Sequence, residues 1–277
     1  MENDLKSVLA ECGFGFKKKF GQNFITDKNL LSCIVAQAGV ESGDTVIEIG
    51  CGAGTLTRAI AERAKKVIAF EIDTSLQPVL SKTLAGVENA EVVFKDFLKV
   101  NLSELEKEIG EYSVVANLPY YVTTPLIMKL LEESKSCKSL TVMVQEEVAL
   151  RLCAKENTPD YGAITAVIAL RARAEIIKKV PRTMFMPRPN VDSAVVKLTV
   201  EDGRIAVNDK ELYKKVVHTA FLSRRKTLEN NLVNSFKITR EQAQNLLTAC
   251  NIDLKARGET LSPQAFASLA DELKNIL

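Results

Sequence analysis

The chain has 277 residues, of which 46% are hydrophobic and 26% are charged, and its formal net charge is +2. This length suits one large domain, or a larger and a smaller one, and the composition is that of a globular protein. The small net charge does not indicate nucleic-acid binding, so such a function has to rest on local clusters of basic residues.

The same inventory disfavours several classes of protein. No stretch approaches ~18 uncharged apolar residues, and the first residues do not resemble a secretory signal, so we expect no membrane association. Six cysteines are scattered without a Cys-x-x-Cys pair, and the chain has one histidine, so we expect no metal site. Free thiols in a reducing cytoplasm are the favoured interpretation of the cysteines.

Short β-branched runs alternate with helical patterns between about residues 45 and 150. Strands are predicted at 45–49, 66–72, 90–94, 113–116 and 139–144, with helices at 56–64, 75–84, 102–109 and 125–133. This alternation is typical of β-α-β units around a parallel sheet and predicts an α/β fold.

A further strand is predicted at 191–200, and from Asn208 onwards the apolar residues follow helical spacing alone. We therefore expect two domains. Residues 1–203 would form the α/β domain, with 1–44 as an N-terminal extension, and residues 204–277 would form a smaller, mostly helical domain.

A glycine-rich segment joins the first predicted strand to the helix after it and reads Glu48-Ile49-Gly50-Cys51-Gly52-Ala53-Gly54. Glycines permit a tight turn and a close approach of a ligand to the backbone. The Gly-x-Gly-x-Gly spacing differs from the Gly-x-Gly-x-x-Gly of dinucleotide sites, and it suits a nucleoside with a sulfonium side chain. Taken alone, the segment is also compatible with a simple tight turn.

Two acidic residues strengthen the prediction of a nucleoside site. Glu71 ends the second predicted strand, where a carboxylate can accept hydrogen bonds from both ribose hydroxyls, and Asp96 ends the third, where it can accept one from an adenine amino group. Ligands of open α/β sheets bind beyond the carboxyl ends of the strands, where all three features meet. Merely exposed strand-end acids are the disfavoured alternative.

The fourth predicted strand ends in Asn117-Leu118-Pro119-Tyr120. The amino nitrogen of adenine is a poor nucleophile because its lone pair is delocalised into the ring. An Asn oxygen and a backbone carbonyl that both accept from this amino group can direct the lone pair toward a methyl donor. Pro119 fixes the backbone, and Tyr120 offers a face on which a base can stack. The segment therefore predicts methylation of an adenine amino group.

Three further segments make the chain resemble the ribosomal RNA adenine dimethyltransferases. They are Phe20-Gly21-Gln22-Asn23-Phe24, the run from Phe185 to Val195 that reads FMPRPNVDSAV, and Phe221-Leu222-Ser223-Arg224-Arg225-Lys226-Thr227-Leu228. The resemblance implies a Rossmann-like class I S-adenosylmethionine-dependent methyltransferase domain followed by a smaller helical domain. Its bacterial members dimethylate two adjacent adenosines in a hairpin near the 3′ end of 16S rRNA.

The resemblance also implies roles for single residues. S-adenosylmethionine would be bound by Asn23, Ile25, Gly50, Gly52, Glu71, Asp96 and Asn117, the first two from the N-terminal extension. Asn117, Leu118, Pro119 and Tyr120 would form the catalytic segment, and Phe185 would sandwich the flipped adenine against Tyr120. At Cys51, Arg188 and Asn190 the sequence departs from the commoner family residues, which affects only the expected loop shape.

Two basic clusters flank the predicted site, and we expect them to contact RNA phosphates: Lys17, Lys18 and Lys19, and Arg224, Arg225 and Lys226. A charge run that is only a solvated face is the alternative. The expected partner is 16S rRNA in the small ribosomal subunit or an assembly intermediate, and the expected form is a cytoplasmic monomer.

Other functions remain as alternatives. A 23S rRNA adenine methyltransferase that confers antibiotic resistance would share the cofactor and Asn-x-Pro-Tyr segments, and a non-catalytic RNA-binding assembly factor would share the fold. The Val191–Val195 and Arg224–Leu228 segments favour the small-subunit enzyme over the former. Intact Glu71, Asp96, Asn117 and Tyr120 argue against the latter. A DNA adenine methyltransferase and a dehydrogenase are less well supported.

Overall fold

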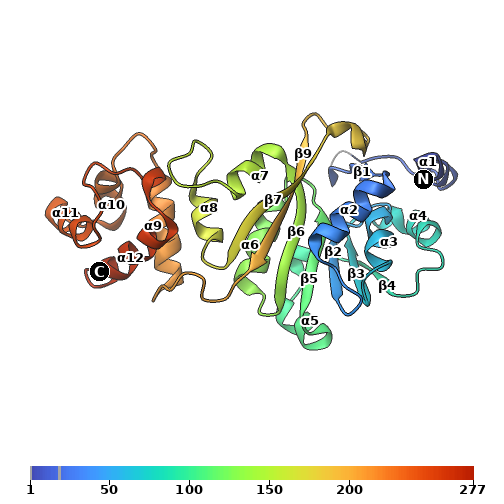
Figure 1. Cartoon of the computed structure of the whole chain (residues 1–277), viewed down its shortest axis with the longest axis horizontal. Helices are drawn as coiled ribbons and strands as arrows, with labels where there is room; N and C mark the ends of the chain where they lie inside the picture. Colours follow the sequence, from blue (N-terminus) through green and yellow to red (C-terminus); the bar gives the residue numbers. More distant parts are fainter. Residues whose placement is uncertain (1, 18–19) are drawn as a thin grey trace. The chain divides into compact units, whose positions relative to one another are not determined.

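A seven-stranded mixed sheet organises the first part of the chain (Figure 1). The computed structural model describes residues 2–17 and 20–277. The strand order of the sheet is β4-β3-β2-β5-β6-β9-β7. Neighbouring strands from β4 to β6 in this order pair in parallel, whereas β9 runs antiparallel to β6. The strands are β2 (Thr45–Ile49), β3 (Lys66–Glu71), β4 (Ala90–Phe94), β5 (Tyr112–Asn117), β6 (Cys137–Gln145), β7 (Ala172–Val180) and β9 (Ser193–Val200). The expected α/β fold is confirmed.

The order of these strands creates a crevice at one edge of the sheet. From β2 the chain proceeds outward through β3 and β4, and then returns to the other side of β2 to form β5 and β6. The crossovers diverge between β2 and β5, so a crevice opens beyond the carboxyl ends of these two strands. The predicted glycine segment follows β2, and the predicted catalytic segment follows β5.

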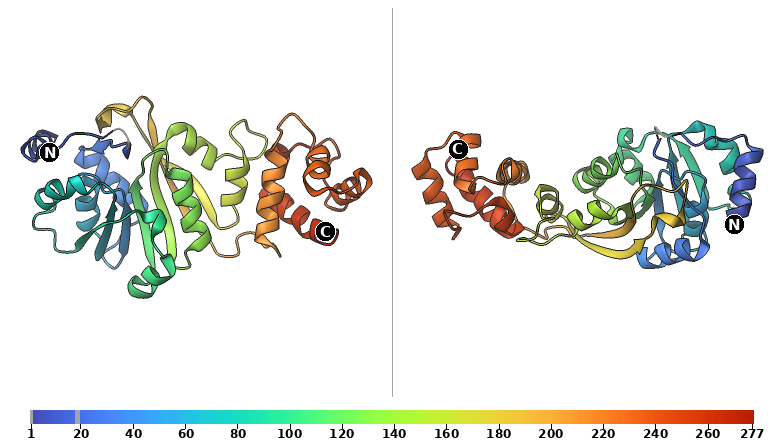
Figure 2. Two further views of the ribbon diagram at one scale, coloured as in Figure 1. Left: turned by 180° about the vertical axis from the view of Figure 1, so that it is seen from behind. Right: turned by 90° about the horizontal axis from the view of Figure 1, so that it is seen from above.

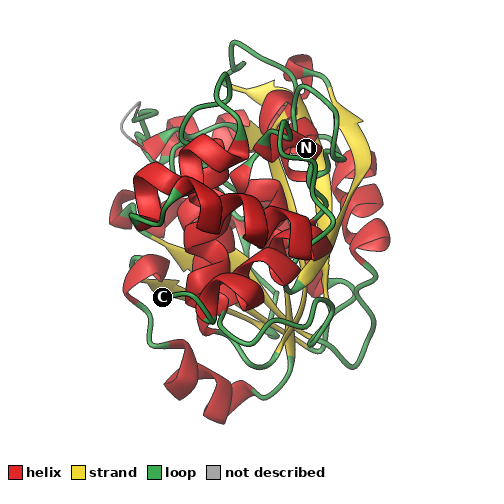
Figure 3. Cartoon of the chain, turned by 90° about the vertical axis from the view of Figure 1, so that its left-hand side faces the viewer, coloured by secondary structure: helices red, strands yellow, loops and turns green. Residues whose placement is uncertain are grey.

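Helices cover both faces of the sheet, as the view from above in Figure 2 shows. Because both faces are covered, the parallel strands are almost continuously apolar: the last four residues of β2 are buried, and Glu48 is the one charged residue among them. Figure 3 distinguishes these strands from the helices. The helices include α2 (Lys28–Ala38), α3 (Thr55–Ala61), α4 (Gln77–Thr83), α5 (Leu102–Ile109) and α6 (Thr123–Glu133).

A two-stranded sheet brings the N-terminal extension to the loop before β9. Here β1 (Phe24–Ile25) pairs antiparallel with β8 (Phe185–Met186), and Ile25 is opposite Phe185. Both side chains are buried in the same core cluster, together with Val180 and Val195. We call residues 20–25 the N-terminal strap, because the pairing holds them beside the ends of β2 and β5. Helix α1 (Glu2–Glu11) precedes the strap.

The second compact unit is helical and consists of residues 150–173 and 201–277. Buried tyrosines join its two segments: the hydroxyl of Tyr213 donates to the Ala166 carbonyl (2.8 Å), and that of Tyr161 to the Leu261 carbonyl (2.9 Å). Its helices are α8 (Ala163–Ile168), α9 (Lys210–Phe221), α10 (Leu228–Phe236), α11 (Arg240–Ala249) and α12 (Pro263–Lys274), and α7 (Glu146–Leu152) leads into it.

This division differs in one respect from the domains expected from the sequence. The second unit begins again at Glu201, close to the expected boundary after residue 203, but residues 150–173 belong to it as well. Their attachment depends on acceptors for Tyr161 and Tyr213 that lie far away in the sequence.

Among the described residues, no helix has the length and apolar character needed to cross a bilayer.

Candidate active site

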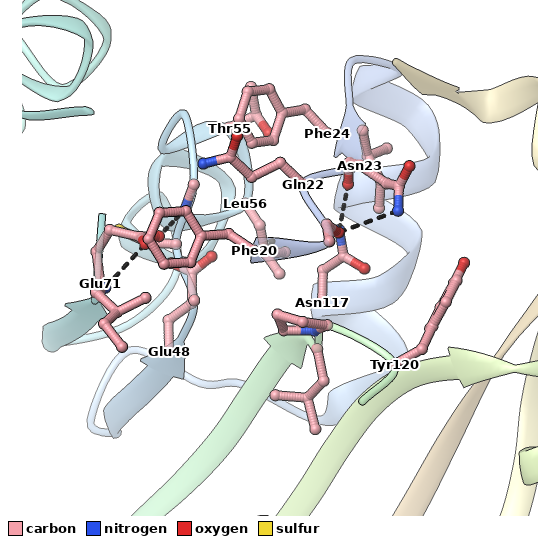
Figure 4. Close-up of a pocket in the computed structure, with 18 of the residues that line it drawn as sticks. Phe20, Gln22, Asn23, Phe24, Glu48, Thr55, Leu56, Glu71, Asn117 and Tyr120 are labelled. Atoms are coloured by element: carbon pink, nitrogen blue, oxygen red, sulfur yellow. Dashed lines mark hydrogen bonds between the residues drawn. The ribbon is translucent and has the colours of Figure 1, made fainter. Parts of the chain in front are cut away.

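A cleft of about 720 Å³, open to solvent, lies at the carboxyl ends of β2, β3 and β5 (Figure 4). The N-terminal strap forms one wall, and the glycine segment and the end of β5 form the others. Most of the residues that the sequence singles out line this cleft together: Asn23, Ile25, Gly50, Gly52, Glu71, Asn117, Leu118, Pro119 and Tyr120.

Asp96 lines an adjoining pocket of about 450 Å³, together with Ile72 and Leu98. The two pockets share Gly50 and Glu71 in their walls, so they form one continuous surface along the ends of β2, β3 and β4. The Asp96 carboxylate accepts a hydrogen bond from the Leu98 amide (3.0 Å), which fixes its position at the end of β4.

The glycine segment turns through left-handed backbone conformations, with φ of 74° at Gly50 and 55° at Gly52. A Cβ atom added to Gly52 would lie 2.8 Å from the Phe24 ring, which is closer than real Cβ contacts allow. Glycine is therefore required at residue 52 for both conformation and space. The strap and the glycine segment pack directly against each other at this point.

Glu71 connects the end of β3 to the glycine segment. One carboxylate oxygen accepts from the Gly52 amide, and the other accepts from the amides of Ile72 and Asp73, each at 2.8 Å. Burial raises the pKa of Glu71, and the three backbone hydrogen bonds oppose this shift. A carboxylate offers about four lone-pair positions, so three backbone donors leave room for about one further donor.

Glu48 is a second buried acid in the cleft, and no role was expected for it from the sequence. Its side chain lines the cleft and is 1% exposed, and its Oε2 atom has no partner at hydrogen-bond geometry, although the nearby Thr57 hydroxyl lowers the pKa of this carboxyl. Burial raises the pKa of Glu48 to about 8. The available signal in the sequence was a charged residue inside an otherwise apolar strand. A buried carboxyl that lacks a partner is costly unless a ligand supplies one.

Asn117 joins the end of β5 to the N-terminal strap. Its Nδ2 atom donates a hydrogen bond to the Asn23 carbonyl at 2.8 Å (Figure 4). A carbonyl only accepts, so the nitrogen of the Asn117 amide must face Asn23, and the Oδ1 atom is the acceptor left for a ligand. The Pro119 carbonyl accepts from the Val122 amide (3.1 Å), which starts the turn into α6.

Tyr120 follows this turn and is half-buried in the wall of the cleft. Its hydroxyl lies 2.9 Å from the Ser193 hydroxyl, and burial raises the pKa of Tyr120. Phe185, by contrast, is 6% exposed and does not line the cleft. Its ring belongs to the same core cluster as the strap residue Ile25, and a sandwich of the base between Phe185 and Tyr120 stays a prediction.

The basic clusters are in different situations. The Lys17 ammonium donates to Asp73 (2.7 Å) and to Ser75 (2.6 Å), and the strap residue Gln22 donates to the other oxygen of Asp73 (2.8 Å). Gln22 therefore fastens the strap to Asp73, just after the end of β3, and Lys17 binds the other oxygen of the same carboxylate. Lys18 and Lys19 lie outside the described residues.

The other basic cluster lies in the helical unit. The guanidinium of Arg224 donates to the carbonyls of Pro159 (3.1 Å) and Tyr161 (2.7 Å), whereas Arg225 and Lys226 are exposed. Arg224 thus has a structural contact, and its two neighbours present their charges to solvent.

In residues 2–17 and 20–277 no group of three or more His, Cys, Asp or Glu side chains could hold a metal ion.

Comparison with known proteins agrees with the geometry of this cleft. The model of the ribosomal RNA adenine dimethylase family matches residues 13–275. Proteins named ribosomal RNA small subunit methyltransferase A are similar over nearly the whole chain. The one from Geobacillus thermodenitrificans is 50% identical, covering 97% of this chain and 94% of its own, and the one from Bacillus licheniformis is 46% identical, covering 98% and 96%.

Solved structures are similar as well. A dimethyladenosine transferase from Plasmodium falciparum has a TM-score of 0.78 and 26% identity, covering 91% of this chain and 98% of its own. The 23S rRNA methyltransferase ErmE has a TM-score of 0.71 and 28% identity, covering 91% and 100%. The family expected from the sequence is therefore confirmed: the chain belongs to the ribosomal RNA adenine dimethylases.

Proposed function

We propose that this chain transfers methyl groups from S-adenosylmethionine to the amino nitrogens of two adjacent adenosines in the 3′-terminal hairpin of 16S rRNA. The observation that carries this proposal is the orientation of Asn117, whose Nδ2 atom binds the Asn23 carbonyl of the strap and whose Oδ1 atom is left for a ligand. The names of the similar proteins support the small subunit as substrate. The setting would be small-subunit biogenesis in the cytoplasm, with the enzyme acting as a monomer.

The residues of the two pockets fit S-adenosylmethionine. The bound cofactor would supply an electrophilic methyl group. Gly50 and Gly52 let it approach the backbone, Glu71 has room for a ribose hydroxyl, and Asp96 can accept from the adenine amino group. Glu48 has an unpartnered buried oxygen, which suits the positive charge of the methionine part. Asn23 and Ile25 would close the site as parts of the strap.

The catalytic segment would prepare the target base. Asn117 Oδ1 and the Leu118 carbonyl accept hydrogen bonds from the two N–H groups of the adenine amino group, which directs its lone pair toward the methyl group. Tyr120 offers a face for stacking, and a base must leave its helix to reach this cleft. Phe185 would form the opposite wall only if part of its ring became exposed; in its buried position it supports the strap.

Two other functions remain to be tested. A 23S rRNA methyltransferase is the closer one, because ErmE shares the fold at a TM-score near that of the dimethyladenosine transferase. The small-subunit names of relatives at 46% and 50% identity favour the main proposal. A non-catalytic assembly factor is disfavoured because Glu71, Asp96, Asn117 and Tyr120 are present and all line the two pockets.

The first test is methyl transfer itself. The protein is incubated with radiolabelled S-adenosylmethionine and with small or large ribosomal subunits from a strain that lacks the modification. We expect label in N6-dimethyladenosine of 16S rRNA, detected after nuclease digestion. Label in 23S rRNA would favour the resistance enzyme instead, and no label in either RNA would contradict an enzymatic function.

Replacing Asn117 tests the catalytic segment. We expect Asn117→Ala to lower the transfer rate by at least ~100-fold, because one of the two acceptors for the amino group is lost. Binding to small subunits, measured by co-sedimentation, should persist. Gln37→Ala, which removes an exposed side-chain amide from α2 of the same unit, is the control and should transfer normally. Normal transfer by Asn117→Ala would show that the assignment is wrong.

Glu48 predicts an unusual dependence of stability on pH. Its pKa is about 8 in the folded protein against an ordinary value of 4.5, so between these values the folded chain keeps a proton that the unfolded chain releases. Stability therefore falls as pH rises through this range. We expect Glu48→Gln to raise the melting temperature by several degrees at about pH 8 and by much less at about pH 5.

The same variant should bind S-adenosylmethionine more weakly in calorimetry, because Gln, unlike Glu, cannot release a proton and supply a negative charge when the positively charged cofactor binds. Glu108→Gln, on the exposed side of α5, is the control for both measurements. A Glu48→Gln protein with unchanged cofactor affinity would remove Glu48 from the proposed site, whatever its effect on stability.

Arg225 and Lys226 test the contact with RNA. We expect Arg225→Ala and Lys226→Ala each to weaken binding to small subunits and to lower the slope of log affinity against log salt by about one. Lys107→Ala, an exposed charge on α5, should leave the slope unchanged. If the slope of the first two variants equals that of the unmodified protein, the cluster is only a solvated surface.

A further inference from the structure

Ser193 contacts the catalytic segment from a distant part of the chain. It is the first residue of β9 and only 1% exposed, and its hydroxyl oxygen lies 2.9 Å from that of Tyr120. A hydroxyl removed from water needs a hydrogen-bond partner, and this contact supplies one for both residues. The pair therefore joins the family signature around residues 185–195 to the wall of the cleft.

The sheet holds Ser193 in a fixed place. Ser193 is opposite Gln145 in the antiparallel ladder between β9 and β6, and Met143 of β6 is opposite both Val195 and Asn117. Ser193 and Asn117 thus lie at the same end of β9 and β5, and the backbone hydrogen bonds of β6, which lies between these strands, hold both. A side chain that is hydrogen-bonded to Ser193 is therefore also held in a fixed position relative to Asn117.

Asp192 fixes the backbone just before Ser193. Its carboxylate accepts from the Arg182 amide (2.9 Å), and its carbonyl accepts from the Glu146 amide (3.1 Å). The chain is therefore held on both sides of the residue that contacts Tyr120: by Asp192 before it and by the β6–β9 ladder after it.

Tyr120, by contrast, lies outside the strands. It follows the Pro119 turn and precedes α6, and it is half-buried, so the ring itself has few constraints from regular structure. A hydrogen bond at the hydroxyl fixes the far end of the ring, and the backbone fixes the near end. With both ends held, the face of the ring keeps one orientation beside Asn117 in the cleft wall. Stacking on a face that is already oriented avoids the cost of ordering it.

We propose that Ser193 is a positioning residue, which holds the Tyr120 ring in the orientation that places the target adenine against Asn117. This inference rests on the proposed function. It assigns to Ser193 an action through Tyr120 and no contact with the reacting atoms. Its consequence is that the two hydroxyls act as one unit, so loss of either should have the same effect as loss of both.

The test compares Ser193→Ala, Tyr120→Phe and the double variant in single-turnover methylation of undermethylated small subunits. We expect each to lower the maximal rate by about three- to tenfold, the range for loss of one hydrogen bond. The double variant should be no slower than either single one. Cofactor affinity in calorimetry and the subunit concentration at half-maximal rate should stay within about twofold, since neither hydroxyl contributes to them.

Ser139→Ala is a matched control, because it removes another buried hydroxyl of the same sheet, which contacts Ser113 at 3.1 Å away from the cleft. It should transfer methyl groups at the normal rate. If Ser193→Ala transfers normally, or if its defect multiplies with that of Tyr120→Phe, the positioning role is wrong. If Ser193→Ala does not fold, the rate of Tyr120→Phe decides alone. An inactive wild-type protein overturns both the proposed function and this inference.

Discussion

The hydrogen bond from Asn117 to the Asn23 carbonyl is the contact on which the site depends. It joins two segments that lie 94 positions apart in the sequence, the end of β5 and the N-terminal strap. The bond fixes which end of the Asn117 amide faces the ligand. It also places the strap over the glycine segment, where Phe24 fills the space above Gly52. Without the strap, the cleft would lack a wall and Asn117 would lack an orientation.

Two buried carboxyls give this cleft its electrostatic character. The buried carboxylate of Glu71 accepts hydrogen bonds from three backbone amides, so it stabilises the shape of the loop. Glu48 has an oxygen without a partner and a pKa raised by burial. A fold selected only for stability would not retain such a group, because a neutral side chain of the same shape would cost less. The two acids thus differ in how their burial is compensated: Glu71 by backbone amides, and Glu48, in the proposed function, by the bound cofactor.

The sequence predicted local elements well and distant contacts poorly. The strands at 45–49 and 90–94 and the helix at 102–109 have the expected limits, because apolar periodicity is a local property. The meeting of Glu71, Asp96 and Asn117 was also predictable, since parallel strands end at one edge. The burial of Phe185, the binding of Lys17 to Asp73 and the attachment of residues 150–173 to the helical unit depend on partners far along the chain. No spacing in the sequence indicates these partners.

The segment 185–195 contacts the site at both the start and the end of the segment. Near its start, Phe185 and Met186 pair with the strap in β8, and near its end Ser193 contacts Tyr120. In the proposed function, the strap lies on the cofactor side of Asn117 and Tyr120 lies on the side of the target base. The single segment 185–195 therefore supports the groups on both sides of Asn117. A substitution in this loop can disturb methyl transfer without touching either ligand, because the orientation of Asn117 depends on the first contact and that of Tyr120 on the second.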